Sequence, residues 1–262
     1  MTRMLGWLGL AIGLSACTAH GPGRDYLARF VTAERQAQPF DPITATMPGV
    51  DMDRAYRLQR DYVRQRLDAG DRIAGYKGGL MSTASLAARH VTEPLVGTLF
   101  ASGRADDGAT ISLCGYRKAS FELKLGYVGQ AVLPVIDLPD IAYRDPDRYG
   151  AIDMIAANIS AARYVRGTPR PAAGIDLDTV PAALFRDGER IAAGSSGESL
   201  GGQRYSREAV LALARRTGRT PTDGDLVVTG KMGDRGWLSP GRYVADYGPL
   251  GRVGFTVVAC TS

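Results

Sequence analysis

The first part of the chain places apolar residues at the spacing of an α-helix. The apolar positions that return every three or four residues are Met52, Ala55, Tyr56, Tyr62, Val63 and Leu67. Asp51 is a favourable N-cap, and Gly70 is a favourable stop after the last turn. We therefore predict a helix over 52–69 with an apolar face packed on the core, and a shorter helix over 26–36.

Beyond Gly70 the chain consists mainly of short apolar runs separated by Gly, Asp and Pro. These runs predict strands at 73–77, 96–100, 110–113, 121–128, 132–138, 182–185, 226–229, 242–246 and 251–258. Turn residues such as Asp107-Gly108 and Asp187-Gly188 lie between them. Helical patterns at 151–165 and 206–216 interrupt the strands. This order predicts an α+β or mostly-β, barrel-like domain behind a helical N-terminal section.

The first 16 residues have the pattern of an export signal. Arg3 precedes an apolar run of 11 residues, 4–14, which suits a signal peptide and is too short to span a bilayer. The run ends in Leu14-Ser15-Ala16-Cys17, which resembles the lipobox of bacterial lipoproteins, whose cysteine thiol carries a diacylglycerol. The alternative is a plain secretory signal followed by a chance cysteine.

With a lipobox, the chain divides into a signal peptide (1–16), a lipidated tether with a helical segment (17–50) and one main domain (51–262). The lipid on Cys17 would be the membrane attachment, since no later apolar run is long enough to span. Thr18, rather than Asp, follows the cysteine, so we expect a periplasm-facing protein of the cell envelope at the outer membrane. Export would permit a disulfide between Cys114 and Cys260, although two separate buried thiols are equally compatible with the sequence.

Composition narrows the function classes. Hydrophobic residues make up 45% and charged residues 23% of the 262 residues, which excludes a disordered chain. The net charge of +5 is spread without clusters, so we expect no nucleic-acid partner. Three cysteines and two histidines exclude a multi-disulfide scaffold and a Cys/His zinc cluster. Nucleophile-elbow, P-loop and HExxH patterns are missing, and a Ser-His-Asp triad would need His90.

The remaining chemistry lies on and beside the predicted strands. Lys77 ends one strand and precedes two glycines, where it could bind a carboxylate or, if buried, exchange a proton. Glu122 and Lys124 are two positions apart on one strand and therefore share a face. Asp137 and Asp140 lie on or after the next run. Such carboxylates could hold a hard divalent cation, and the alternative is an ordinary polar strand face.

Taken in order, these stretches resemble the 2-keto-4-pentenoate hydratase branch of the fumarylacetoacetate hydrolase superfamily. The stretches that carry the resemblance are Lys77-Gly-Gly-Leu-Met-Ser82, Glu93–Phe100, Asp107-Gly108, Glu122-Leu-Lys124, Ile155–Ser160 and Gly224–Gly230. It extends over roughly residues 50–260, nearly all of the main domain. The resemblance implies a mixed β-roll of the fumarylacetoacetase type and, as in that family, a homo-oligomer.

The resemblance also implies an Mg²⁺- or Mn²⁺-dependent site for a small anionic 2-oxo acid. The metal would polarise the substrate so that water adds across its distal double bond. By position, Lys77 matches the active-site lysine and Glu122 the first metal carboxylate. Ser82, Thr229 and Gly230 fall near the substrate. Asp137 takes the place of a further metal carboxylate under one alignment, and a different gap would put Pro134 there.

One position departs from the family pattern in a way that bears on catalysis. Lys124 stands where the family has its second metal carboxylate, and a protonated lysine cannot ligate a cation. The Lys124 ammonium could take the cation's place between Glu122 and Asp137.

Three hypotheses about function follow. The first is a hydratase-like lyase for a short 2-oxo or 2-hydroxy-dienoic acid. In it, Lys77 orients the substrate carboxylate, Lys124 attracts the anionic substrate, and Glu122 with Asp137 binds a metal or serves as acid or base. The second is a non-catalytic envelope lipoprotein that binds a small carboxylate on the same fold. The third is a related C–C hydrolase or decarboxylase.

Overall fold

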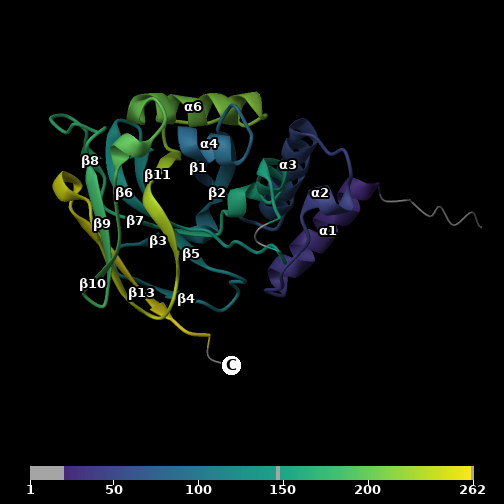
Figure 1. Cartoon of the computed structure of the whole chain (residues 1–262), viewed down its shortest axis with the longest axis horizontal. Coiled ribbons are helices and arrows are strands. Elements are labelled where there is room, and N and C mark those ends of the chain that lie inside the picture. The colour runs from purple at the N-terminus through teal and green to yellow at the C-terminus, as the bar shows by residue number, and fades with distance from the viewer. Residues whose placement is uncertain (1–20, 146–147, 261–262) are drawn as a thin grey trace, which may run out of the picture.

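A computed structural model describes residues 21–145 and 148–260 of the chain. Cys17 and the lipobox lie outside the described residues. The N-terminal section is helical and lies beside the strands (Figure 1), with α1 (Pro22–Arg35), α2 (Ile43–Thr46) and α3 (Met52–Asp68). The predicted N-cap of α3 is present, because Asp51 Oδ1 accepts a hydrogen bond of 2.7 Å from the Arg54 amide. Phe30 of α1 packs edge-on against Tyr62 of α3, which joins the first helix to the core.

Two curled sheets contain the strands of the described chain. The larger runs in the order β2 (Leu95–Phe100), β1 (Ile73–Gly79), β11 (Leu226–Trp237), β5 (Ser120–Val128), β6 (Ala131–Leu138), β7 (Arg163–Arg166) and β3 (Arg104–Asp106), with β8 (Arg170–Pro171) beside β6. The smaller runs in the order β10 (Glu189–Ser195), β9 (Pro181–Arg186), β12 (Gly241–Asp246), β13 (Arg252–Val258) and β4 (Ala109–Ser112). Most strand pairs are antiparallel, but β1 is parallel to β11, β3 to β7 and β13 to β4. The predicted α+β roll is therefore confirmed.

Three further helices, α4 (Thr83–Ala88), α5 (Ala151–Ala156) and α6 (Gly202–Arg216), connect the strands. The long helix α6 lies along one end of the larger sheet, where it packs on β1, β2 and β11 (Figure 1). Buried side chains from both sheets and from the helical section form one large core. An exception to the predicted apolar face of α3 is Leu67, which is 40% exposed.

The predicted helix over 151–165 is wrong in its second half. The helix α5 ends at Ala156, and a 3₁₀ turn, η2 (Asn158–Ser160), leads into strand β7. Asn158, Ile159 and Ser160 have φ of 51°, 52° and 53°, a left-handed backbone that ends any right-handed helix. The side chain of Asn158 holds this turn in place, since it accepts from the Thr98 amide and donates to the Thr98 carbonyl, at 2.7 and 2.9 Å.

The structure contains a disulfide between Cys114 and Cys260. Its position follows from the sheet register. Strands β4 and β13 are parallel, and Ser112 pairs with Val258, so both cysteines lie two residues beyond the same rung. Of the alternatives left open by the sequence, paired or separate thiols, the structure has the pair. In the described part of the chain, no helix is long and apolar enough to cross a membrane.

Candidate active site

Most of the residues that the sequence analysis selected meet at one cavity of about 580 Å³. Strands β1, β5 and β11 and the start of α4 form much of its wall. The selected residues that line it are Lys77, Ser82, Glu122, Lys124 and Gly230. Asp137 lies directly behind this wall, in contact with both lysines.

Sheet register brings the two carboxylates together. Strands β5 and β6 are antiparallel, and Glu122 is the direct register partner of Asp137, so their side chains share a face. Lys124, two residues along β5, projects from that face as well. Its Nζ lies 3.0 Å from Glu122 Oε2 and 3.3 Å from Asp137 Oδ2. The same Nζ donates to the carbonyl oxygen of Gly78, at 3.3 Å.

Lys77 reaches this group from a distant strand. In the sheet order, β11 and β5 lie between β1 and β6, which would separate Lys77 from Asp137 by roughly 14 Å in a flat sheet. Because the sheet curls, Lys77 Nζ instead lies 2.6 Å from Asp137 Oδ2. Two ammonium groups therefore share one carboxylate oxygen, and Asp137 Oδ1 has no hydrogen-bond partner among the described residues.

Burial and charge set the protonation of these groups. Lys77, Lys124 and Asp137 are each at most 2% exposed. Burial lowers the pKa of Lys77, and the nearby charge of Lys124 lowers it further against the opposing effect of Asp137. Burial also opposes the charge of Lys124, but Glu122 and Asp137 outweigh it and raise the pKa of Lys124. Burial opposes the charge of Asp137, yet the two lysines hold its pKa below the usual value.

This donor set does not fit a divalent cation. A metal bridging Glu122 and Asp137 would have to lie where the Lys124 ammonium lies, within 3.3 Å of both carboxylates. Lysine has no lone pair for a metal while it is protonated, and its pKa is raised here. Among the described residues, no three His, Cys, Asp or Glu side chains gather into a metal site. The expectation that Glu122 and Asp137 ligate a metal therefore does not fit the observed geometry.

The residues expected near the substrate take different positions. Ser82 lines the cavity and caps α4, since its Oγ accepts from the Ser85 amide at 3.2 Å. Gly230 lines the cavity where a β-carbon would come within 2.8 Å of Ser199 Oγ, so the position needs glycine. Thr229 is fully buried and does not line the cavity; its hydroxyl lies 2.8 Å from Gln203 Oε1. Thr229 thus supports the wall from behind.

Several cavity residues were missed by the sequence analysis. Arg89, Lys231 and Arg235 add positive charge to the wall, and the accompanying acid is Asp234. Arg89 donates to the Tyr149 carbonyl and lies over the Tyr149 ring at 4.4 Å from its centroid. Together with the central group, the site holds five basic side chains against three acidic ones. One available signal was the group of charged residues Lys231, Asp234 and Arg235 directly after Gly230, where the strand continues to Trp237.

Known proteins resemble this chain in both sequence and fold. No family model matches the chain. The 2-keto-4-pentenoate hydratase of Paraburkholderia xenovorans (strain LB400) is 30% identical over 230 residues, covering 80% of this chain and 84% of that protein. A 4-oxalocrotonate decarboxylase of Pseudomonas putida is 26% identical over 243 residues. This match covers 84% of this chain and 91% of that protein.

A solved structure shares the whole architecture. The 4-oxalocrotonate decarboxylase from Pseudomonas putida G7, complexed with magnesium and adipate, superposes with a TM-score of 0.86 at 21% identity. The match covers 90% of this chain and 97% of that one. The sequence likeness to the hydratases and this common fold lead to one conclusion: the chain belongs to the 2-keto-4-pentenoate hydratase family, the branch of the fumarylacetoacetate hydrolase superfamily that its motifs resemble.

Proposed function

We propose that this protein is a hydratase-like lyase that adds water to a short 2-oxo or 2-hydroxy-dienoic acid. The observation that carries the proposal is the pair of ammonium groups, Lys77 and Lys124, on the wall of a cavity with excess positive charge. The relationship to the hydratases supports the reaction class. A cavity built this way favours a small anion over a neutral or cationic ligand.

Lys124 has the position and charge to stabilise the reacting anion. Its pKa is raised, so the group stays an ammonium at neutral pH. When the substrate enolises, negative charge grows on the 2-oxo oxygen, and a buried ammonium stabilises that charge more than bulk water does. Glu122 and Asp137 keep Lys124 in place through contacts of 3.0 and 3.3 Å. Lys124 thus contributes fixed positive charge.

Lys77 is placed to exchange protons. Burial and the neighbouring ammonium lower its pKa, which brings the amine closer to use as an acid or base. Asp137 Oδ2, 2.6 Å away, holds the Lys77 amine in position for that exchange. In the proposed reaction, water supplies a hydroxyl group to one carbon of the distal double bond and a proton to the other. Lys77 moves one proton, so the atoms balance without an added reactant.

In this proposal the reaction proceeds without a divalent cation. Two related decarboxylase structures contain magnesium or calcium. In this chain, the Lys124 ammonium supplies positive charge between the carboxylates instead. Saturable binding of Mg²⁺ or Mn²⁺ at this site would contradict the proposal.

A second candidate is the decarboxylation of a 2-oxo dicarboxylate. Arg89, Lys231 and Arg235 provide positive charge in the cavity for a second carboxylate. The likeness to 4-oxalocrotonate decarboxylases supports this alternative. The two reactions differ in their product, because only decarboxylation releases carbon dioxide.

A direct assay tests the function. The protein is mixed in separate reactions with 2-hydroxypenta-2,4-dienoate and with the dicarboxylate 4-oxalocrotonate. The loss of conjugated ultraviolet absorption is recorded for the first and the release of carbon dioxide for the second, each with and without a chelator. We expect hydration that the chelator does not slow, a loss of at least about tenfold in Lys124→Met, and no loss in Lys118→Met. Lys118 is the matched control, since it is an exposed residue that contacts the Trp237 ring and does not line the cavity. No turnover in any condition would favour a non-catalytic carboxylate-binding lipoprotein.

We also propose that the protein is a lipoprotein of the cell envelope, anchored through Cys17 and facing the periplasm at the outer membrane. The Cys114–Cys260 disulfide supports an oxidising compartment. Labelled palmitate should enter the wild-type protein and not Cys17→Ser, and fractionation should recover the label with outer membranes. Assembly into a homo-oligomer stays a prediction, for which light scattering of the soluble domain is the measurement.

A further inference from the structure

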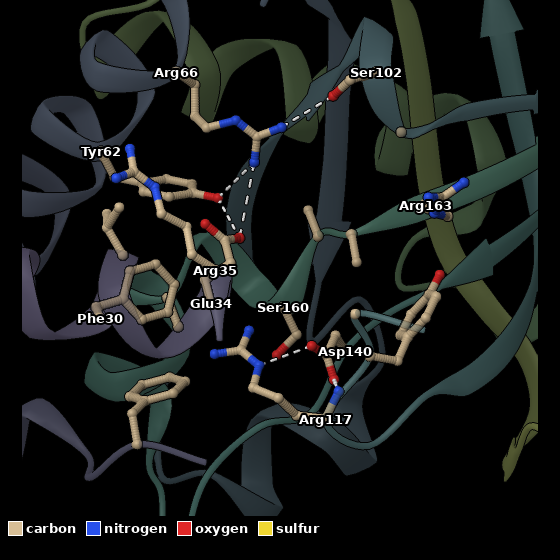
Figure 2. Close-up of a pocket in the computed structure, with 18 of the residues that line it drawn as sticks. Phe30, Glu34, Arg35, Tyr62, Arg66, Ser102, Arg117, Asp140, Ser160 and Arg163 are labelled. Carbon is tan, nitrogen blue, oxygen red and sulfur yellow. Dashed lines mark hydrogen bonds and ion pairs between the residues drawn. The ribbon is translucent and has the colours of Figure 1, made fainter. Parts of the chain in front are cut away.

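A second cavity, of about 460 Å³, lies where the helical section meets the larger sheet (Figure 2). We call it the arginine pocket, because Arg35, Arg66, Arg117 and Arg163 line it. Among the described residues, only Ser160 lines both this pocket and the candidate active site. The left-handed Asn158–Ser160 turn, fixed to Thr98, therefore forms part of the wall between two separate cavities.

The arginine pocket carries excess positive charge. Its acidic residues are Glu34 and Asp140, so four guanidinium groups face two carboxylates. Arg66 is engaged with Asp71 at 2.6 Å and more loosely with Glu34 at 3.8 Å. Arg35 and Arg163 are exposed residues. Their side chains make no hydrogen bond or ion pair with the described chain. Both are therefore available to an anion.

Arg117 is the buried member of the group. Its side chain is 5% exposed, and its Nε donates to Asp140 Oδ2 at 2.8 Å. The Nη1 atom is buried without a hydrogen-bond partner in the described chain. Asp140 Oδ1 cannot readily supply one, because it already accepts from the amides of Arg117 and Lys118. A buried donor without a partner is costly, and an additional acceptor would relieve that cost.

The rest of the lining is suited to an apolar group. The rings of Phe30 and Phe40 lie 5.8 and 5.2 Å from the Arg117 guanidinium carbon, and Figure 2 shows Phe30 and Tyr62 on the same side of the pocket. Planar guanidinium groups pair well with carboxylates, often through two hydrogen bonds. Aromatic walls beside them favour a ligand with an apolar body over a bare inorganic ion.

We propose that the arginine pocket is a second ligand site, which binds a small organic carboxylate with an apolar body. The carboxylate end lies among the guanidinium groups and the apolar end against Phe30 and Phe40. This site is independent of the reaction proposed for the Lys77–Lys124 cavity, since the charged side chains that line the two cavities are different.

Calorimetric titration with hexanoate tests the second site, with the first site altered by Lys124→Met in parallel. We expect a saturable hexanoate site that is retained in Lys124→Met, in which anion binding at the Lys77–Lys124 cavity is weakened. Binding should weaken at least about tenfold in the double variant Arg35→Gln with Arg163→Gln, which removes two exposed and unpaired charges. Arg144→Gln is the matched control, because this arginine is 65% exposed outside the pocket, and its variant should bind normally.

Several outcomes would overturn the proposal. They are no hexanoate binding in the wild-type protein, unchanged affinity in the double variant, or binding that disappears in Lys124→Met. Inorganic phosphate is a second probe, and phosphate binding as tight as that of hexanoate would contradict an apolar ligand. Turnover of the dienoate is measured on the same samples. A failed second site and a failed lyase function therefore give separate results.

Discussion

Lys124 and Glu122 stand two positions apart on β5, and the ammonium nitrogen of one lies 3.0 Å from a carboxylate oxygen of the other. The ion pair fills the space beside Asp137 that a divalent cation would need in order to bridge the two carboxylates. The Lys124 ammonium therefore stands where the family resemblance implies a divalent metal ion.

Replacing the lysine by an acid should create a metal site. Lys124→Glu removes the ammonium and places a third carboxylate beside Glu122 and Asp137, an oxygen-rich set that suits Mg²⁺ or Mn²⁺. We expect saturable Mn²⁺ binding by calorimetry in this variant and none at this site in the wild-type protein. Lys118→Glu makes the same charge change outside the cavity and is the control. Equal affinity in all three proteins would show that Lys124 does not replace the cation.

The Asp137 carboxylate should contribute stability that depends on pH. Its pKa is lowered from 3.8 in the folded protein, so the ionised group stabilises the fold above pH 3.8. That contribution is lost as the pH falls through the lowered folded value. Asp137→Asn leaves two buried ammonium groups without this partner and should cost about 3–5 kcal/mol at pH 7.

Urea unfolding at a series of pH values tests this linkage. The difference in free energy of unfolding between wild type and Asp137→Asn should shrink as the pH falls below 3.8. Asp41→Asn is the control, since the Asp41–Arg144 pair is exposed and should contribute less than about 1 kcal/mol at any pH. A difference that stays constant with pH would contradict the assignment of a lowered pKa to Asp137.

Gly97 of β2 packs against the left-handed Asn158–Ser160 turn beside the active site, and a larger residue at this position should be destabilising. A β-carbon at Gly97 would lie 2.9 Å from the Asn158 carbonyl oxygen, a contact with backbone that cannot rotate away. We expect Gly97→Ala to lower the free energy of unfolding by about 1–3 kcal/mol, and to weaken substrate turnover by shifting the cavity wall. Gly224→Ala should be neutral in thermal unfolding, because the nearest atom to its β-carbon is 3.9 Å away.

The disulfide should stabilise the protein substantially. Cys114 and Cys260 are 146 positions apart, and closing such a long loop restricts the unfolded chain by about 4–5 kcal/mol. The double variant Cys114→Ser with Cys260→Ser should melt well below the wild-type protein. Dithiothreitol should lower the melting temperature of the wild type towards that of the variant and leave the variant itself unchanged. Equal melting of both proteins without reductant would refute the bond.

Thr229 should matter for stability rather than for substrate binding. Its hydroxyl contacts Gln203 Oε1 and the Leu125 carbonyl behind the cavity wall, at 2.8 and 3.2 Å. Thr229→Val should cost about 1 kcal/mol, since Gln203 Oε1 keeps a hydrogen bond of 3.0 Å from Tyr127. We expect KM for the dienoate to change less than about twofold. A tenfold rise in KM with normal thermal stability would instead place Thr229 in contact with the substrate.

Local patterns were enough for much of the fold. The N-cap at Asp51, the start of α3 at Met52 and the strand that carries Glu122 and Lys124 depend on neighbouring residues, and each lies where the sequence predicts it. The helix over 151–165 fails for a non-local reason. Asn158 is held by the backbone of Thr98 on another strand, and no periodicity within the segment encodes that partner.

The sequence by itself determined which side chains share a strand face, which turns join the strands and which family the chain resembles. Those properties depend on spacing and residue type alone. Only the tertiary structure decided that Lys77 meets Asp137 across two intervening strands, that Thr229 lies behind the wall and that four arginines from separate segments surround one pocket. The physical reason is that sheet curl and helix docking set distances between remote segments, and these arise from packing of the whole core.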